Sequence, residues 1–444
     1  MEADTSEYRR EKVKLVNFLP FFIASVLIAV LLFSFSAVGG AHALASVLYV
    51  DDSSGTDDSN CQTASDPCKT INYAIGQASI GDSILIAGGT YTENVIVNQE
   101  VSLIGGYEAT GWTRDLSTNT TIIDANNSGR PVTVNDDQQN VVLDGLEIVG
   151  GNTTQDGGGI YITGGDVQIL NSVIGENTTT ACCGGVHSGN SATVMISDTE
   201  ISFNYAEGSG GGIGIFSGSI VTLKGSIVSF NESNESGGAI DVNFSKANVS
   251  DTYIQYNDAR VHSGALSTFL STALLTNTLF TNNQTISNTA NVMGINMSSV
   301  SINNSTLADN NPNGDQAIIT WSGAITMPQS VLTITNSIMW NNGLSLQSDS
   351  PCSDCFVINY SDIQGIDGLA GVSEGVENFD ADPLFVDQDY GDYHLLSNSP
   401  CINKGDPESN LVFDIEGNPR TPPPDVGAYE WIGIKIFLPM VVKK

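Results

Sequence analysis

The 444-residue chain carries 15 Lys and Arg against 49 Asp and Glu, which gives a formal net charge of -34 at pH 7. Such a charge repels nucleic acids and anionic membrane surfaces, so neither is expected as a partner. The chain has 46 Gly but also 40% hydrophobic residues, which is too many for a disordered chain. The composition therefore indicates a turn-rich folded protein.

The N-terminus has the layout of a signal peptide. Four basic residues between Arg9 and Lys14 precede an uncharged apolar run from Leu15 to Val38, and small residues follow up to Ala45. We expect cleavage after Ala45, which leaves no membrane span in the mature chain. The run is also long enough to cross a bilayer, so an uncleaved anchor is the alternative. In both cases the rest of the chain is exported to the extracellular space, the cell surface or the cell envelope, with the outer membrane included.

Seven cysteines are present, and an exported protein meets oxidising conditions in which neighbouring cysteines form disulfides. Cys61 and Cys68 are the best candidate pair, and we predict a disulfide between them. The Cys352-x-x-Cys355 motif lacks the further ligands that a zinc site needs, so a local bridge or two free thiols is expected. Adjacent Cys182 and Cys183 permit only a strained vicinal disulfide, and their state stays open.

A short sequence motif repeats along the middle of the chain. Its copies end at Asn152, Asn177, Asn204, Asn231, Asn257, Asn283, Asn310 and Asn342. The steps between these residues are 25, 27, 27, 26, 26, 27 and 32, so the period is nearly constant and the last step carries an insertion. A repeat of roughly 26 residues is typical of a solenoid.

Each repeat contains two further short sequence motifs. One is glycine-rich, as in Gly157-Gly-Gly-Ile160, and the other alternates apolar and polar residues, as in Val194-Met-Ile196. Three short strands per repeat form a coil, and stacked coils place equivalent residues about 4.8 Å apart. The fold class predicted is all-β, a single-stranded right-handed parallel β-helix. The residues expected to stack inside it are Ile160, Val186, Ile213, Ile240 and Leu266.

The repeated Asn and Gly residues are predicted to form the corners of the coil. Asn tolerates left-handed backbone and bonds to the main chain nearby, while consecutive Gly allow a sharp corner that a Cβ would obstruct. The Asn-x-Ser/Thr triplets at Asn152, Asn177, Asn231 and Asn283 also match glycosylation acceptors. We prefer turn geometry as their explanation, because they fall at the repeat's corners.

The segment from Ser229-Phe-Asn231 to Gly237-Gly-Ala-Ile240 resembles the repeat of polymorphic outer membrane proteins of bacteria. The resemblance covers roughly residues 144–310. Several copies lack the Phe, as at Gly175, Tyr256 and Ala308, so the match is to the coil architecture more than to adhesin function.

The segments before and after the repeats resemble a broader family. Residues 70–82 have apolar residues at helical spacing and predict a capping helix, which covers the open edge of the first coil. With Gly88-Gly-Thr-Tyr-Thr-Glu93, this stretch resembles the entrance of pectin-lyase-like β-helix proteins. Residues 380–430 resemble the C-terminal region of choice-of-anchor surface proteins. Within that region, we expect Arg420 to pair with Asp414 or Asp425 and Cys401 to be a buried, unpaired thiol.

These features give the predicted domain organisation, which is the signal peptide or anchor (1–45), an N-terminal cap (46–83), the β-helix repeats (84–365), a C-terminal cap (366–431) and an apolar tail (432–444). The tail is too short to cross a bilayer. It is either an added edge strand or an attachment segment.

No catalytic residue is assigned. A polyuronate lyase needs a Lys or Arg base beside further positive charge, but between residues 141 and 345 the only such side chains are Lys224, Lys246 and Arg260, which share no repeat position. The carboxylate pair Asp136-Asp137 lies in a polar turn sequence. The clustered signatures of a polygalacturonase are absent.

One face of the predicted helix carries candidate binding residues. Alignment on the glycine-rich motif puts Tyr161, His187, Gly214, Asp241 and Ser267 at one position of successive coils. Their mixed polarity predicts solvent exposure, so Tyr161, His187 and Asp241 are candidates for a shallow glycan groove, and an ordinary exposed face is the alternative. His187 and Asp241 lie two coils apart, about 9.6 Å by strand spacing, which is too far for a direct bond.

A metal site is the other chemical candidate. Asp51, Asp52, Asp57 and Asp58 supply oxygen ligands around a glycine and are candidate Ca²⁺ ligands, although they lack EF-hand spacing. A hydrophilic loop is the alternative, and no cofactor is expected to be required.

The function predicted from these observations is that of a monomeric, noncatalytic, adhesin-like surface protein. Its expected partners are polysaccharides or cell-envelope surfaces. A calcium-assisted polysaccharide lyase or glycoside hydrolase is the alternative.

Overall fold

A computed structural model describes residues 45–135, 140–286, 292–310, 318–321, 330–342, 346–348, 355–366 and 375–433. The described residues belong to one compact unit. The predicted signal peptide or anchor, the Asp136-Asp137 pair, Cys352 and nearly all of the apolar tail lie outside the described residues. Within the described ranges, no helix has both the length and the apolarity to cross a membrane.

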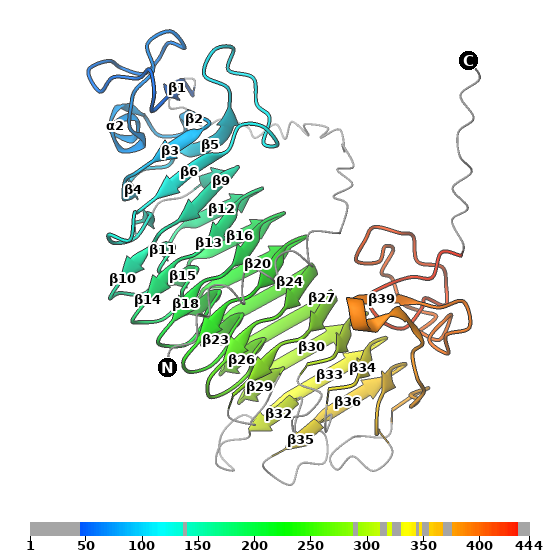
Figure 1. The fold of residues 1–444 in the computed structure, drawn as a ribbon. Coiled ribbons are helices and arrows are strands. Elements are labelled where there is room, and N and C mark those ends of the chain that lie inside the picture. The colour runs from blue at the N-terminus through cyan, green and yellow to red at the C-terminus, as the bar shows by residue number, and fades with distance from the viewer. Residues whose placement is uncertain are drawn as a thin grey trace, which may run out of the picture. The chain divides into compact units, whose positions relative to one another are not determined.

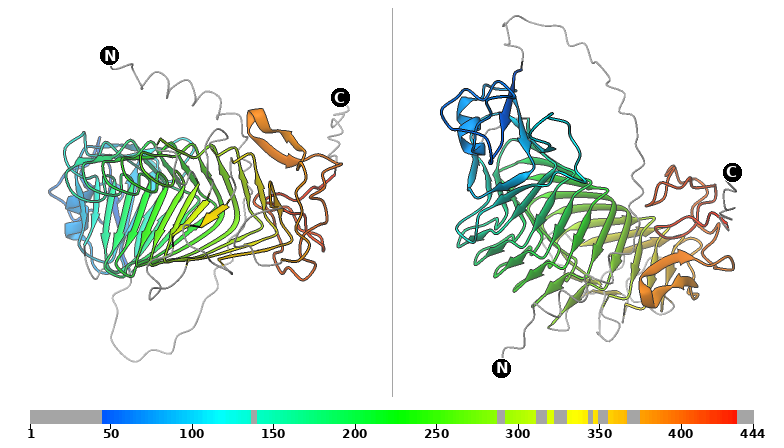
Figure 2. Two further views of the ribbon diagram at one scale, coloured as in Figure 1. Left: turned by 90° about the horizontal axis from the view of Figure 1, so that it is seen from below. Right: turned by 45° about the horizontal axis from the view of Figure 1, so that its top comes forward.

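The chain winds into stacked coils whose strands pair in parallel (Figures 1 and 2). In a typical coil, β11 (Ile160–Thr163) is followed by β12 (Asp166–Leu170), β13 (Val173–Gly175) and the two-residue β14 (Thr178–Thr179). Each strand pairs with its equivalents in neighbouring coils. The predicted parallel β-helix is confirmed, with one strand per coil more than the sequence pattern indicated.

Strands of the β11 type form sheet II, and strands of the β14 type form sheet III. Sheet II contains β4 (Val95–Val97), β7 (Val132–Val134), β11, β15 (Val186–Gly189), β19 (Ile213–Phe216), β23 (Ile240–Asn243), β26 (Leu266–Phe269), β29 (Met293–Asn296), β32 (Ile318–Trp321) and β35 (Leu346–Ser348). Sheet III contains β10 (Asn152–Thr153), β14, β18 (Tyr205–Ala206), β22 (Glu232–Ser233), β25 (Asp258–Ala259) and β28 (Gln284–Thr285).

Sheet I holds the strands of the β12 and β13 types, which merge into one long strand in two coils. It contains β1 (Val47–Val50), β2 (Ser83–Ala87), β3 (Gly89–Tyr91), β5 (Ser102–Tyr107), β6 (Thr121–Asp124), β8 (Val141–Asp144), β9 (Leu146–Val149), β12, β13, β16 (Thr193–Ser197), β17 (Glu200–Ser202), β20 (Ile220–Lys224), β21 (Ile227–Ser229), β24 (Lys246–Gln255), β27 (Thr272–Thr281), β30 (Ser299–Asn303), β31 (Thr306–Ala308), β33 (Val331–Thr335), β34 (Ile338–Trp340), β36 (Phe356–Asn359) and β37 (Asp362–Ile363).

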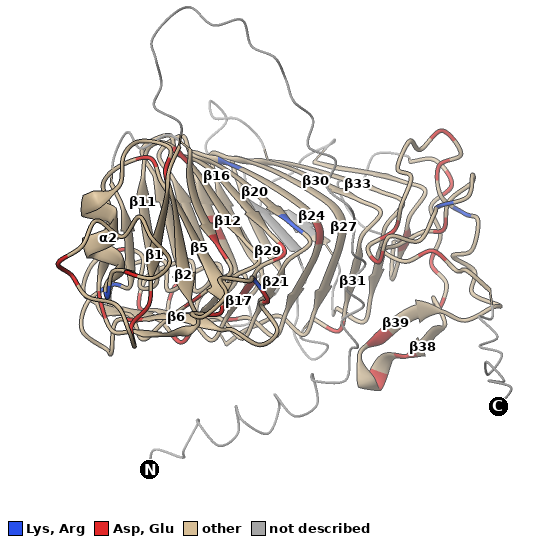
Figure 3. Cartoon of the chain, turned by 90° about the horizontal axis from the view of Figure 1, so that it is seen from above, with Lys and Arg blue, Asp and Glu red and all other residues tan. Residues whose placement is uncertain are grey.

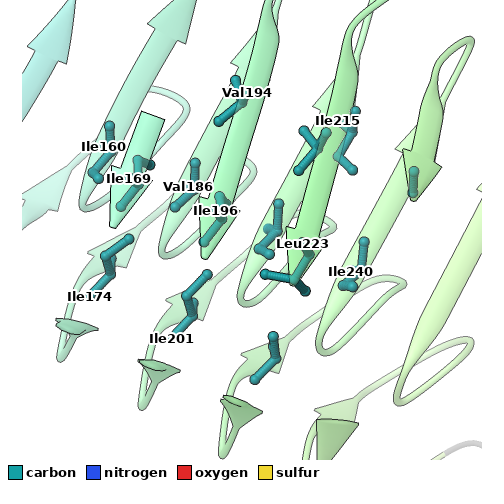
Figure 4. Packing of buried hydrophobic residues seen from close by; sticks show 14 of the residues in the cluster. Ile160, Ile169, Ile174, Val186, Val194, Ile196, Ile201, Ile215, Leu223 and Ile240 are labelled. Atoms are coloured by element: carbon teal, nitrogen blue, oxygen red, sulfur yellow. The ribbon is translucent and has the colours of Figure 1, made fainter. Parts of the chain in front are cut away.

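The core is a set of apolar ladders that run along the coils. Ile160, Val186, Ile213, Ile240 and Leu266 pair in that order across sheet II, and each is at most 1% exposed. Figure 4 labels Ile160, Val186 and Ile240 beside inward residues of sheet I. The predicted register is therefore confirmed. Full burial of one such side chain stabilises the fold by about 1.5–3 kcal/mol.

A second ladder is polar and buried. Asn231 is typical, because its Nδ2 donates to the carbonyl oxygen of Ile201 (2.8 Å) and to Oδ1 of Asn257 (3.0 Å), while its own Oδ1 accepts from the backbone N–H of Asn204 (3.1 Å). The same pattern joins Asn177, Asn204, Asn231, Asn257, Asn283, Asn310 and Asn342.

The ladder corrects two sequence interpretations. The left-handed residue at this corner is the one before the Asn, such as Phe230 with φ of 55°, and not the Asn itself. Asn152 is not part of the ladder, since it pairs with Thr178, and the backbone N–H of Gly151 donates to Asn177 instead.

The ladder also bears on whether the Asn-x-Ser/Thr triplets are glycosylation sites. Asn177, Asn231 and Asn283 are at most 1% exposed and their amides are bonded inside the coil, which favours corner geometry over glycosylation. Asn152 is exposed. The consecutive glycines have the predicted steric cause, since a Cβ on Gly184 would lie 2.5 Å from the carbonyl oxygen of Gly211.

The N-terminal end is covered by the helix α2 (Ile71–Gln77), drawn in blue in Figure 1. Thr70 caps it by accepting from the N–H of Tyr73, and Glu93 accepts from the N–H groups of Ile71 and Asn72. Ile71, Ala74 and Ile75 are buried against the core. The disulfide between Cys61 and Cys68 lies in the preceding loop, as predicted.

The C-terminal region contains an antiparallel hairpin of β38 (Phe385–Asp387) and β39 (Asp392–Leu395), joined by the 3-10 turn η1 (Gln388–Tyr390). Cys401 is buried and unpaired, as expected, and its thiol donates to Asp362 at 3.3 Å.

The predicted ion pair of Arg420 is wrong in its partner. Arg420 pairs with Glu430 at 3.4 Å, and it also donates to the carbonyl oxygens of Gly427 and Ala428. Asp414 and Asp425 instead accept backbone N–H groups of the surrounding turns.

Candidate binding surface

The row predicted from the sequence exists on the outer face of sheet II. Tyr161, His187, Gly214, Asp241 and Ser267 occupy one register position of successive strands. The predicted exposure is wrong for Gly214, His187 and Asp241, which are buried, the last two at 7% and 3% exposed, whereas Tyr161 and Ser267 are partly exposed. The glycine-rich turn before each strand folds over this face, so that a Cβ on Gly157 would lie 3.0 Å from the Cβ of His187.

Aromatic stacking fixes the N-terminal part of the row. The ring of His187 stacks between Tyr161, at 4.8 Å between centroids, and Phe216, at 5.4 Å. The guanidinium of Arg130 lies 4.6 Å from the centroid of Tyr161 and donates to the carbonyl oxygens of Asp156 and Gly157. Burial lowers the pKa of His187 to about 4, so its imidazole is neutral at pH 7.

Asp241 is separated from His187 by the strand that carries Gly214, so the two side chains do not form an acid–base pair. Its carboxyl group accepts from Nδ2 of Asn243 and bonds to Ser267. Burial raises the pKa of Asp241 to about 7, and these hydrogen bonds oppose that rise only in part.

The aspartates proposed for calcium do not converge on one point. Asp51 accepts from the hydroxyl and N–H groups of Ser53 and Ser54. Asp57 accepts from Thr70 and from the N–H of Lys69, which ties the loop to the start of α2. Over the described part of the chain, Asp51, Asp52, Asp57 and Asp58 are not among the groups of three or more potential metal ligands.

An open groove that was not predicted from the sequence lies beside the row of Tyr161, His187 and Asp241, at the corner between sheets II and I. The groove has a volume of about 550 Å³ and runs across four coils. It is lined by Gly218, Ser219, Ile220, Phe244, Ser245, Lys246, Leu270, Ser271, Thr272, Met297, Ser298 and Ser299. Lys246 is the one charged residue in this lining, and Figure 3 shows how few basic residues the described chain carries.

Large apolar residues occupy the left-handed corner of this groove in three successive coils. Phe244, Leu270 and Met297 have φ of 50°, 49° and 47°, and Phe244 is 57% exposed. At the corresponding corner the preceding coil has Ser217, which is also left-handed. Left-handed backbone is the regular geometry at the corners of this coil, as at Phe230 and Tyr256, so this corner differs in presenting apolar side chains to an open groove.

The ring of Phe244 is held in place by its neighbour. It meets the ring of Phe269 edge to face, with 5.2 Å between centroids, while more than half of the Phe244 side chain stays exposed. The spacing of 26 and 27 residues between Phe244, Leu270 and Met297 was visible in the sequence. This spacing alone does not predict a surface groove, because apolar residues that point into the core recur at the same period.

No protein-family model matches the sequence, and no curated protein matches it. Among solved structures, the chain is similar to the pectate lyase Pel9A, with a TM-score of 0.50 and 15% identity over 88% of this chain and 97% of that one. The fold is a right-handed, pectin-lyase-like β-helix.

Two weaker similarities are to XylC in complex with xylose (TM-score 0.43, 9% identity, 86% and 98% covered) and to the GH136 lacto-N-biosidase from Eubacterium ramulus (TM-score 0.46, 12% identity, 76% and 67% covered). At these identities the likeness to Pel9A shows the fold alone, and one fold hosts many functions.

Proposed function

We propose that this is an exported surface protein that binds polysaccharide in the groove at the corner of sheets II and I without cleaving it. The observation that carries the proposal is the line of apolar side chains of Phe244, Leu270 and Met297 along an open groove. A shallow apolar strip edged with serine and threonine hydroxyls suits a sugar ring, which has an apolar face and a polar rim.

The groove's chemistry favours binding over cleavage. A glycoside hydrolase uses two carboxylic acids, and none of the described residues that line this groove is Asp or Glu. A lyase needs a base beside positive charge that neutralises the substrate's carboxylate, and Lys246 is the single cation of the lining. The net charge of -34 also opposes an acidic ligand, so the proposed ligand is a neutral polysaccharide.

Phe244→Ala is expected to weaken binding of a neutral polysaccharide by about tenfold, since loss of one aromatic contact costs about 1.4 kcal/mol. Affinity electrophoresis or calorimetry over a panel of neutral and acidic polysaccharides measures it. The matched control is Tyr390→Ala, which removes an aromatic side chain that is 82% exposed in η1, away from the groove.

Equal affinities of the two variants would contradict the proposed groove. Products are assayed in the same incubations, with and without calcium. Unsaturated ends or new reducing ends that accumulate over many turnovers would show a lyase or a hydrolase and would overturn the noncatalytic proposal.

Lys246→Ala is expected to leave binding of neutral polysaccharides within about twofold of the wild type, because an exposed charge contributes little to an uncharged ligand. Any residual binding of acidic polysaccharides is expected to fall and to lose its dependence on salt. Lys224→Ala removes another exposed Lys, at the C-terminal end of β20, and is the control. A large loss of neutral ligand with Lys246→Ala alone would contradict a neutral ligand held by stacking.

A further inference from the structure

The turn before β15 brings two thiol-bearing residues to a histidine. Cys183, with φ of 69°, takes the left-handed position that Gly157, Gly210 and Gly237 hold in other coils. This conformation directs its sulfur over the outer face of sheet II. Nδ1 of His187 lies 3.4 Å from Sγ of Cys183 and 3.6 Å from Sγ of Cys182.

The neighbouring coil leaves room for this arrangement. Gly214 follows His187 in the outward row, and a Cβ at that position would overlap Sγ of Cys183. The space that a side chain takes in the other coils is thus filled by this sulfur together with the ring of Phe216. The turn is also tied down, because the N–H of Cys182 donates to Asp156 at 3.2 Å.

The atoms of this cluster match a metal site in type, and the distances from Nδ1 to the two sulfurs match it in spacing; the two sulfurs are bonded to each other and have to separate before both can bind an ion. In the described part of the chain, Cys182, Cys183 and His187 are the only group of three potential ligands within 4.8 Å of one another. Two ligands with bonds of about 2.1 and 2.3 Å to a tetrahedral Zn²⁺ lie roughly 3.6 Å apart, close to the separations from Nδ1 to the two sulfurs.

In the structure, Cys182 and Cys183 form a vicinal disulfide, which leaves the sulfurs without the charge that a metal ligand needs. We propose that this turn is a redox-gated Zn²⁺ site, closed by the Cys182–Cys183 disulfide and opened when a dithiol reduces it. The dithiol supplies two electrons and two protons and leaves as its own disulfide, so two thiols form. Zn²⁺ then displaces those two protons and binds both thiolates and Nδ1 of His187.

Three protein ligands leave a fourth position for water, as in open zinc sites. Cys182 is half-buried, whereas Cys183 and His187 are buried, so both the dithiol and the ion reach the site from the side of Cys182. The proposal does not depend on polysaccharide binding, since none of these residues lines the groove.

The test compares the wild-type protein with Cys182→Ser, which removes both the vicinal disulfide and one ligand. Each protein is prepared in two forms, oxidised and reduced with a dithiol. The dithiol is removed in the absence of air, and both forms are then dialysed against Zn²⁺. We expect reduced wild-type protein to bind one Zn²⁺ more than reduced Cys182→Ser, and the two oxidised proteins to bind equally. Co²⁺ in place of Zn²⁺ should give thiolate-to-metal absorption in reduced wild-type protein that weakens with His187→Asn.

Cys401→Ser is the matched control, since it removes a thiol that lies outside the cluster, and it should keep the extra Zn²⁺. Circular dichroism and thermal melting of every variant show whether the β-helix is intact. Equal Zn²⁺ binding by reduced wild-type protein and a folded Cys182→Ser variant would overturn the proposal, and so would extra Zn²⁺ bound by the oxidised wild type.

Discussion

Asn231→Ala is expected to lower the free energy of unfolding by about 4 kcal/mol. The substitution leaves the backbone N–H of Asn204 buried without its acceptor, which costs about 1–3 kcal/mol, and it removes the hydrogen bond that Asn231 donates to the carbonyl oxygen of Ile201, worth about 1 kcal/mol. It also removes the acceptor of the Asn204 amide, at 3.0 Å. Guanidinium unfolding, followed by circular dichroism, should show a lower midpoint.

Asn152→Ala is the control for this prediction, because Asn152 carries the same side chain but is exposed and lies outside the ladder. Its effect is expected to stay within about 0.5 kcal/mol. Similar losses from both substitutions would mean that the ladder does not stabilise the coil through its buried amides.

Most of the coil could be predicted from the sequence because equivalent residues of each repeat take the same position in successive coils. The inward position of Ile160, Val186 and Ile213 follows from period-two alternation once the repeats are aligned. The first copy was misaligned by one residue, because Asn152 follows directly on Gly151, which takes the ladder position. With Gly151 in that place, the spacing to Asn177 is 26 residues, in line with the later coils.

The candidate sites were less predictable, since they depend on how turns pack. The sequence placed His187 and Asp241 in one row but could not show that glycine-rich turns cover that row. The left-handed backbone that presents Phe244 has no signature in the residue itself. The partner of Arg420 was missed for a related reason, because several acidic residues lie near it in sequence and tertiary packing alone selects Glu430.

Asp241→Asn is expected to stabilise the protein at pH 8 by about 4 kcal/mol relative to the wild type and to have little effect at pH 4. Burial raises the pKa of Asp241 to about 7 in the folded state, against about 3.9 for an unfolded Asp. The folded state therefore favours the protonated carboxyl group. The stability that this group contributes is fully present below pH 4 and is lost as the pH rises to about 7.

The measured quantity is the difference in free energy of unfolding between Asp241→Asn and the wild type from pH 4 to pH 8, because the difference cancels the titration of the other buried acids. Asn keeps a side-chain oxygen for Asn243 and Ser267 but has no charge to bury, so this difference should rise with pH and then level off above pH 7. A difference that stays constant with pH would show that Asp241 is ionised in the folded protein and that water or a cation reaches it beneath the turn at Gly237.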